Sequence, residues 1–219
     1  MVLACVPRYN LPKSCSNVYE PAEDSYLLLD ALLEEQSFLK SLCPTICAEI
    51  GCGTGVIFTY LAALLHQNGQ NALFFATDIN PEAALVASQT ATLNKVPFVD
   101  IIRTDLLSSL DHRLEQSIDV LIFNPPYVPT PSYEMRSHGI EAAWAGGVHG
   151  REVIDRMLPR VKKVLSPSGV LYMIVLAENR PKEIIQILQR DHLETTIVLS
   201  RKCSNEKLFV LKAQRRHGA

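Results

Sequence analysis

The chain has 219 residues, a length that suits one domain with a full core, or a domain with a short extension. Hydrophobic residues make up 47% of it, and its apolar runs are far too short to span a bilayer, so the composition excludes a membrane-spanning chain. The formal net charge is −2, which gives no overall field to draw the chain to phosphate backbones.

The amino-terminal residues carry no recognisable leader. They lack a basic segment followed by a long apolar one, so we expect no signal peptide. The chain contains 6 cysteines, none of them in a C-x-x-C pair, which argues against a disulfide framework and against a structural zinc site. We therefore expect reduced thiols, no metal site and a cytoplasmic protein, with the nucleus left open as a second location.

The pattern of prolines and apolar residues predicts the elements in chain order. Residues 1–18 look irregular, because prolines interrupt them and no period holds. Pro21 opens a predicted helix over residues 21–42, in which leucines recur at helical spacing. The remaining predicted elements are strand 46–50, helix 56–66, strand 72–78, a helix begun by Asn80-Pro81-Glu82, strands 98–105 and 118–124, a Pro- and Gly-bearing stretch over 128–150, a helix through about Leu165, strand 169–177, helix 181–191 and strands 194–200 and 206–213.

Alternating strands and helices predict an α/β fold. We expect a doubly wound sheet of seven strands, mostly parallel, with helices on both faces. The last two predicted strands have no helix between them and should form a C-terminal antiparallel hairpin. This gives an irregular extension over residues 1–18 and a single domain over 19–219. In such sheets ligands bind beyond the carboxyl ends of the strands.

A glycine-rich turn, "EIGCGTG", follows the first predicted strand. Gly51, Gly53 and Gly55 let the backbone turn tightly and approach a ligand closely. The third glycine comes one residue earlier than in the dinucleotide fingerprint, and no Walker lysine follows, so neither of those nucleotide sites is indicated. Taken alone, the pattern is equally that of a tight strand-to-helix turn without a ligand.

Acidic residues end the next two predicted strands. The Asp78 carboxylate could accept hydrogen bonds from both hydroxyls of a ribose, or it could cap the following helix. Asp105 could meet an adenine amino group, with Leu106 against the ring, or it could be an ordinary turn residue. Asn124 ends the fourth strand. The glycine turn, Asp78, Asp105 and Asn124 follow four successive predicted strands. Together they indicate a ligand site far more specifically than any one of them does alone.

The fourth strand runs into Asn124-Pro125-Pro126-Tyr127, where the prolines prevent it from continuing. The Asn124 side-chain carbonyl and the Pro125 backbone carbonyl could accept the two N–H bonds of a planar –NH₂ group, and Tyr127 could stack on it. Hydrogen bonds that strengthen as the nitrogen becomes positive would stabilise a methyl-transfer transition state without a strong base. His138, His149 and Arg151 are therefore not needed as acid–base groups. The alternative is a proline-terminated strand with no chemistry.

Together these motifs resemble the class I S-adenosylmethionine-dependent methyltransferases, from about residue 19 to the end. The resemblance implies S-adenosyl-L-methionine as cofactor, with its methionine part at the glycine turn and no metal. It places Asp78 at the ribose, Asp105 and Leu106 near the adenine, and Glu49 in support of the turn or cofactor.

Two further stretches, "VYEPAEDSYLLLDAL" (18–32) and "SHGIEAAWAGGVHGREVIDR" (137–156), resemble the eukaryotic and archaeal HemK-type methyltransferases. Those enzymes modify the glutamine of the Gly-Gly-Gln motif in class I translation termination factors, and this chain matches their short type. The resemblance implies that the first helix closes over the cofactor and that a loop after the prolines shapes the substrate site, although core packing is an alternative for both. The residues concerned are Glu20, Glu23 and Ser25 on the helix, and Trp144, Gly146 and Gly147 in the loop.

The leading function is thus methylation of a protein glutamine in the termination factor. Alternatives are lysine methylation of a histone tail, N6-adenine methylation of DNA, for which the chain lacks a basic face or recognition domain, and an inactive scaffold. The resemblance also implies a small zinc-binding activator protein. We expect it to pair with the strand near residues 98–103, which should lie at the sheet edge with apolar side chains on both faces.

Overall fold

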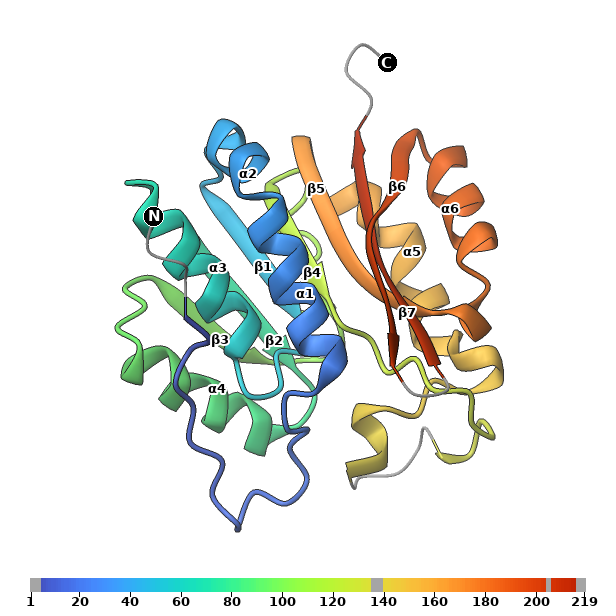
Figure 1. The fold of residues 1–219 in the computed structure, drawn as a ribbon, viewed down its shortest axis with the longest axis horizontal. Coiled ribbons are helices and arrows are strands. Elements are labelled where there is room, and N and C mark those ends of the chain that lie inside the picture. Colours follow the sequence, from blue (N-terminus) through green and yellow to red (C-terminus); the bar gives the residue numbers. More distant parts are fainter. Residues whose placement is uncertain (1–4, 135–139, 204–205, 216–219) are drawn as a thin grey trace.

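The structure is a computed structural model that describes residues 5–134, 140–203 and 206–215. These residues form one seven-stranded sheet in the order β3-β2-β1-β4-β5-β7-β6 (Figure 1). Neighbouring strands from β3 to β5 are parallel, and β7 pairs antiparallel with both β5 and β6. The predicted doubly wound, mostly parallel sheet with a C-terminal hairpin is confirmed. The strands are β1 Ile46–Ile50, β2 Leu73–Asp78, β3 Val99–Arg103, β4 Ile118–Phe123, β5 Leu165–Leu176, β6 Leu193–Cys203 and β7 Glu206–Arg215.

Helices cover both faces of the sheet. α1 and α3 pack against each other on one face, and α5 lies on the opposite face (Figure 1). None of the helices in the described ranges has both the length and the apolar character needed to cross a membrane. The helices are α1 Glu23–Glu34, α2 Gln36–Leu42, α3 Val56–Gln67, α4 Pro81–Leu93, α5 Glu152–Val164 and α6 Pro181–Arg190.

The single helix predicted over residues 21–42 is wrong, because the chain forms two helices with a break at Glu35. The Glu35 carboxylate accepts a hydrogen bond of 2.9 Å from the Tyr172 hydroxyl and pairs with Lys212, both from the sheet beneath. These contacts come from strands that are distant in the sequence. The helical spacing of apolar residues therefore could not predict the break at Glu35. The helix also begins at Glu23, two residues after the proline.

Residues 5–22 form no helix or strand, but they are tied to α4. Cys15 and Val18 pack against Ala83 and Val86, and the Asn80 side chain donates a hydrogen bond to the backbone oxygen of Asn17. Asn80 also caps α4 by accepting from the backbone N–H of Glu82 at 2.9 Å. The extension therefore runs past the carboxyl end of β2, next to the place where the site forms.

The strand predicted near residues 98–103 lies at the sheet edge, as expected. Phe98, just before β3, is 56% exposed. Val99, Ile101 and Ile102 are only partly buried against the core. The strand thus keeps a free edge and accessible apolar surface.

Candidate active site

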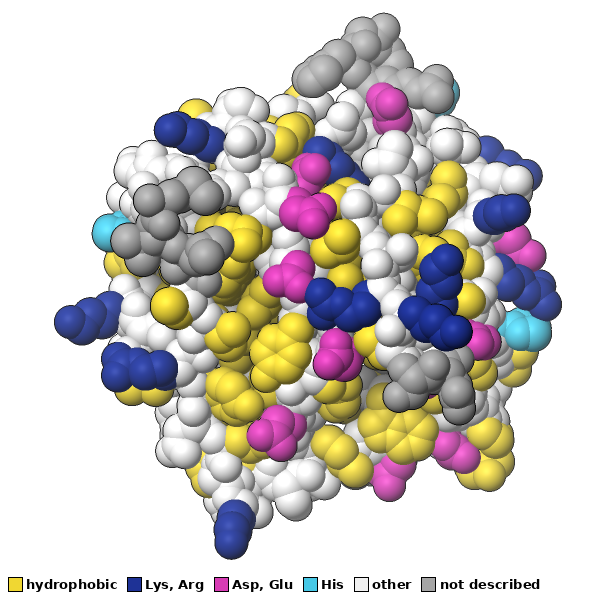
Figure 2. Space-filling model, in the orientation of Figure 1, with side chains coloured by type: hydrophobic (Ala, Val, Ile, Leu, Met, Phe, Trp, Pro, Cys, Tyr) yellow, Lys and Arg dark blue, Asp and Glu magenta, His cyan; other side chains and the backbone are white. Residues whose placement is uncertain are grey.

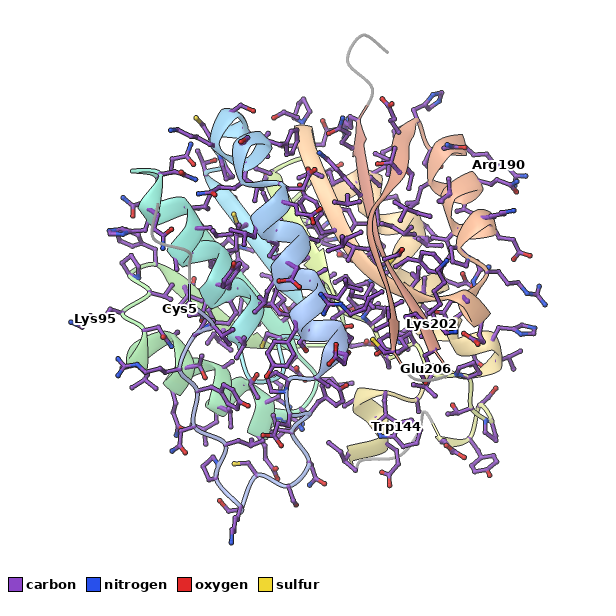
Figure 3. The ribbon with its side chains drawn as sticks, viewed as in Figure 1. Cys5, Lys95, Trp144, Arg190, Lys202 and Glu206 are labelled. Carbon is purple, nitrogen blue, oxygen red and sulfur yellow. The ribbon has the colours of Figure 1, made fainter. Side chains whose placement is uncertain are left out.

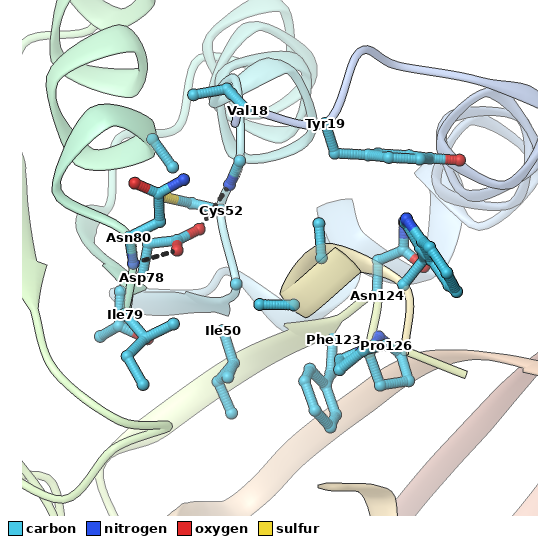
Figure 4. Close-up of a pocket in the computed structure, with 18 of the residues that line it drawn as sticks. Val18, Tyr19, Ile50, Cys52, Asp78, Ile79, Asn80, Phe123, Asn124 and Pro126 are labelled. Carbon is cyan, nitrogen blue, oxygen red and sulfur yellow. Dashed lines mark hydrogen bonds between the residues drawn. The ribbon is translucent and has the colours of Figure 1, made fainter. Parts of the chain in front are cut away.

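A cavity of about 1010 Å³ opens at the carboxyl ends of the parallel strands. In Figure 4, Asp78 and Asn80 lie on one side of it, and Asn124, Pro126 and Tyr19 on the other. Most of the residues chosen from the sequence line this cavity: Ser25, Glu49, Gly51, Gly53, Asp78, Asp105, Leu106, Asn124, Pro125, Pro126, Tyr127 and Trp144. Four strand ends far apart in sequence therefore contribute to one site.

Gly53 and Gly55 of the glycine turn serve different structural purposes. Gly53 has a φ of +51°, and a Cβ built on it would meet nothing within 4 Å, so this part of the turn leaves space for a ligand. Gly55 has a φ of +77°, and its Cβ would lie 2.9 Å from the Cα of Ala87 on α4. Gly55 does not line the cavity; its lack of a side chain lets α3 and α4 approach each other.

Asp78, at the end of β2, holds the turn in place. One carboxylate oxygen accepts from the backbone N–H of Gly53 and the other from that of Asn80, each at 2.9 Å (Figure 4). Burial raises the pKa of Asp78, and the hydrogen bonds oppose that shift. Because each carboxylate oxygen can accept a second bond, both remain able to receive a ligand hydroxyl. The capping role that was the alternative for Asp78 belongs to Asn80.

Glu49 is 1% exposed and lies under the turn. Its Oε2 accepts from the backbone N–H of Phe58 at 2.8 Å, whereas its Oε1 has no partner among the described residues. Burial raises the pKa of this carboxyl well above its ordinary value. A buried acceptor without a partner, on the wall of a large cavity, is available to a donor from a ligand.

Asp105 lines the cavity, but its carboxylate forms an ion pair with Arg156 of α5. Leu106 follows with a φ of +53° and is buried in the same wall. The loop after β3 thus brings an acid, its counter-ion and an apolar side chain together at one end of the cavity. The assignment of this end to an adenine stays a prediction.

Asn124, at the end of β4, lines the cavity. Its Nδ2 donates to Asp24 Oδ2 at 3.0 Å, and its buried Oδ1 has no partner among the described residues. The Tyr127 hydroxyl donates to the same Asp24 oxygen at 3.0 Å. Burial, followed by the nearby Asp24 charge, raises the pKa of Tyr127. The strand end thus carries a free carbonyl acceptor beside an aromatic ring.

Glu20 and Glu23, which the resemblance places over the cofactor, have other partners in the structure. Glu20 accepts a bond from the Tyr9 hydroxyl and Glu23 pairs with Arg201, and neither lines the cavity. Asp24, which was overlooked, is 4% exposed and does line it. A signal was present, because Asp24 occupies the apolar stripe of α1 together with Leu27, Leu28 and Ala31.

The loop after the prolines runs alongside the strand end. Val128 donates to the backbone oxygen of Trp144 at 2.9 Å and accepts from the N–H of Gly146 at 2.9 Å. A Cβ on Gly146 would lie 2.7 Å from the backbone oxygen of Pro126, and Gly147 holds a φ of +72°. Trp144 lies in the cavity wall, at the same end of the molecule as Glu206 (Figure 3). Glu206 also lines the cavity, and no sequence motif marks it as a site residue.

Arg151 and His149, two of the acid–base candidates considered in the sequence, are not among the described residues that line the cavity. Arg151 is buried and pairs with Asp155 and Glu183, so its contacts tie together α5 and α6. The His149 ring contacts Arg180, and His138 lies outside the described residues. The described ranges contain no group of three or more His, Cys, Asp or Glu side chains that could hold a metal ion.

Asn179, which the sequence reading also missed, connects β5 to the site. It is fully buried, accepts from the backbone N–H of Leu176 at 2.6 Å and donates to the backbone oxygens of Tyr127 and His149 at 2.8 Å each. It therefore fixes the chain just after the prolines. A single asparagine after a strand has no distinctive pattern, so this role was not visible in the sequence.

Comparison with known proteins accounts for this arrangement. Residues 23–138 match the family model described as the methyltransferase small domain. The human protein named methyltransferase HEMK2 is 50% identical over 197 residues, which cover 90% of this chain and 89% of that protein. The chain belongs to the HemK-type methyltransferases.

Two further relatives agree with that placement. A putative protein N5-glutamine methyltransferase of Methanocaldococcus jannaschii is 33% identical over 198 residues, covering 90% of this HemK-type chain and 92% of that protein. Among solved structures, the Mtq2–Trm112 complex from E. cuniculi, described as responsible for methylation of the eRF1 translation termination factor, contains a chain with a TM-score of 0.66 and 32% identity. The match covers 91% of this chain and 99% of that one.

Proposed function

We propose that this enzyme transfers a methyl group from S-adenosyl-L-methionine to the side-chain amide nitrogen of a protein glutamine, in the Gly-Gly-Gln motif of the class I translation termination factor. One observation of the structure carries the proposal: Asn124 lines a large cavity at the end of β4, and its buried Oδ1 has no hydrogen-bond partner among the described residues. The similar proteins named above, an N5-glutamine methyltransferase and an enzyme that acts on eRF1, support the same substrate.

The cavity fits this cofactor in size and in chemistry. S-adenosylmethionine carries a sulfonium, an ammonium and two ribose hydroxyls, which are all positive charges or hydrogen-bond donors. The wall offers matching acceptors in the carboxylate of Asp78 and in the unpartnered Oε1 of Glu49. We assign the ribose to Asp78 and the methionine part to the turn at Gly51 and Gly53, near Ser25.

The chain's own groups hold and orient the acceptor nitrogen. When bound, the cofactor supplies a methyl group on a positively charged sulfur, which departs with the bonding electrons as a neutral thioether. Asn124 Oδ1 and the Pro125 carbonyl accept the two N–H bonds of the glutamine amide, so that its nitrogen lone pair can form the new N–C bond. These two acceptors bind the nitrogen more strongly as it becomes positive, and the nitrogen then releases one proton to solvent.

The other substrates considered are not favoured. The two similar proteins named above whose descriptions state a substrate refer to protein glutamine and to eRF1, and neither refers to histone lysine or DNA. On the face shown in Figure 2, acidic and basic side chains are interspersed, which is unlike the single-sign surface of a DNA-binding protein. An inactive scaffold is disfavoured because Asn124 and Asp78 both line the cavity.

We also propose that a small zinc-binding activator pairs with the free edge of β3. The Trm112 partner in the similar complex supports an activator, and the exposed Phe98 with the half-buried Val99, Ile101 and Ile102 offers apolar contacts for a strand added at this edge. This chain would then depend on the partner for solubility, because an uncovered apolar edge promotes aggregation.

The test of function is methylation of a recombinant termination factor with isotope-labelled cofactor, followed by peptide mass spectrometry. We expect one methyl group on the glutamine of Gly-Gly-Gln and none when that glutamine is replaced by alanine. A histone tail and a duplex oligonucleotide run in parallel are the comparison substrates. Faster turnover on either of them than on the termination factor would overturn the proposal.

A further inference from the structure

The carboxylate of Asp24 lies directly behind the Asn124 amide. We propose that Asp24 is a positioning residue, which decides which end of the Asn124 side chain faces the substrate. This inference rests on the proposed function, in which Asn124 receives the amide nitrogen of a glutamine. It adds a reason why that nitrogen, and not the amide oxygen, is presented for methylation.

Asp24 is held on several sides. Its Oδ1 accepts from the backbone N–H of Ser25 at 2.7 Å and from the Tyr19 hydroxyl at 3.3 Å. Its Oδ2 accepts from Asn124 Nδ2 and from the Tyr127 hydroxyl, each at 3.0 Å. The carboxylate is 4% exposed and accepts hydrogen bonds at both oxygens, which hold it in a fixed orientation.

A carboxylate has no hydrogen to donate, so it imposes one orientation on the neighbouring amide. If the Asn124 amide rotated by half a turn, its Oδ1 would face Asp24 Oδ2 and a charge-assisted hydrogen bond would become a repulsive contact. The –NH₂ of Asn124 must therefore point back to α1. This turns Oδ1 away from Asp24, where it is buried without a partner among the described residues, in a residue that lines the cavity.

A hydrogen-bond acceptor at this place determines whether an incoming amide binds through its nitrogen or through its oxygen. The oxygen of a carboxamide is its more electron-rich atom, so a site that held the oxygen forward would direct the methyl group to the wrong atom. Asn124 Oδ1 attracts the N–H end and repels the oxygen end. Asp24 thus determines substrate chemistry through Asn124, without touching the substrate itself.

The negative charge of Asp24 also lacks a cationic partner. Arg201 of β6 pairs with Glu23 and Asp30 of α1, and the five groups that donate to Asp24 are neutral: the backbone N–H and hydroxyl of Ser25, the hydroxyls of Tyr19 and Tyr127, and Asn124 Nδ2. Within the described residues the charge remains uncompensated by an ion pair. It can therefore favour the positive charge that develops on the acceptor nitrogen.

The test compares Asp24→Asn with Asp30→Asn as a matched control. Asp24→Asn keeps the shape of the side chain but can offer an –NH₂ to Asn124, which frees the Asn124 amide to rotate. At saturating cofactor and termination factor, we expect kcat to fall by about 10- to 100-fold, the range that misorientation of a reacting group produces. Asp30→Asn removes an acid of the same helix that pairs with Arg201, and we expect kcat within about two-fold of the wild type.

Nuclear magnetic resonance of the side-chain amides gives a readout independent of turnover. The Asn124 –NH₂ signals are identified by their loss in Asn124→Ala. We expect them to be protected from solvent exchange in the wild type, to shift in Asp24→Asn and to be unchanged in Asp30→Asn. Protection of the Asn124 –NH₂ protons in the wild type tests the contact with Asp24 even if the Asp24→Asn variant is unstable.

The role of Asp24 and the proposed function can be refuted separately. If the wild type methylates the glutamine but Asp24→Asn keeps kcat within about two-fold, or if the Asn124 signals are unprotected in the wild type, Asp24 does not position Asn124. If the wild type, co-purified with the proposed activator, does not methylate the termination factor at all, the proposed function is wrong, and the amide signals still report on the Asp24–Asn124 contact.

Discussion

The backbone of Gly150 lies so close to that of Tyr127 that a Cβ atom on Gly150 would stand 1.8 Å from the Tyr127 carbonyl oxygen. The same oxygen accepts a hydrogen bond from Asn179 at 2.8 Å. The loop after the prolines is therefore held by backbone packing and by one buried amide, and its position should be sensitive to a single methyl group at residue 150.

We expect Gly150→Ala to lower kcat by at least about ten-fold, because the loop must move away and take Tyr127 with it. Gly69→Ala is the control. Gly69 has a φ of +73°, similar to +66° at Gly150, but its Cβ would meet nothing within 4 Å. The two variants share the backbone strain and differ in the clash. Equal steady-state kinetics for them would show that the contact with Tyr127 does not matter.

Replacement of Asp78 should weaken cofactor binding. Asp78→Ala removes the acceptor proposed for the ribose and releases the turn at Gly53, so we expect a loss of roughly 1.5–3 kcal/mol in binding free energy, the scale of hydrogen bonds to a charged group. Isothermal titration calorimetry measures this directly. Unchanged affinity would rule out Asp78 as a cofactor ligand.

Replacement of Asn124 should separate chemistry from binding. We expect Asn124→Ala to keep cofactor affinity within a few-fold, because the contacts assigned to the ribose lie across the cavity (Figure 4). Most turnover should be lost with the acceptor at Oδ1. Calorimetry and a methylation assay on the same preparation test both parts, and an active variant would refute the mechanism.

The proposed activator surface can be tested at the two edges of the sheet. Ile101→Lys and Ile102→Lys should abolish co-purification, but these side chains also pack against the core, so Phe98→Asp is the cleaner probe. We expect it to remove the activator in a pull-down while the chain stays folded by circular dichroism. Ile197→Asp is the control, because Ile197 is a 47% exposed apolar residue of β6 at the opposite edge. Loss of the activator with Ile197→Asp alone would place the interface elsewhere.

Glu49 should make stability depend on pH. Burial raises its pKa in the folded state, so the folded chain holds this proton more tightly than the unfolded chain. The resulting stabilisation is present at low pH and is lost as the pH rises above the unfolded pKa. Glu49→Gln removes that titration. Relative to the wild type, its gain in unfolding free energy should grow as the pH rises above the unfolded pKa of a glutamate.

Urea denaturation at several pH values measures this difference. Glu115→Gln is the control, because Glu115 is exposed in the loop before β4 and its removal should give no such trend. A difference between Glu49→Gln and the wild type that stays constant with pH would show that Glu49 does not titrate in this range.

The sequence determined the order of the strands along the chain and the chemistry at their ends. The turn at Gly51, Asp78, Asp105 and Asn124 each follow a buried apolar run, and the carboxyl ends of parallel strands meet at one side of a sheet. That rule was enough to predict that these residues share a site. Local signals also placed the start of α4, because Asn80-Pro81 is a cap followed by a first-turn proline.

Only the tertiary structure decided which side chains act on one another. Glu23 and Asp24 are adjacent acids, yet one pairs with Arg201 of β6 and the other is buried beneath Asn124. Helical periodicity separates the two by about 100° of rotation, but it cannot name a partner 100 residues away. The same holds for Glu35 with Tyr172 and for Asn179 with Tyr127. A buried hydrogen bond forms only where two elements pack closely enough to bring its donor and acceptor together. The packing of the whole core sets the distance between those two groups, and the residues near either partner do not.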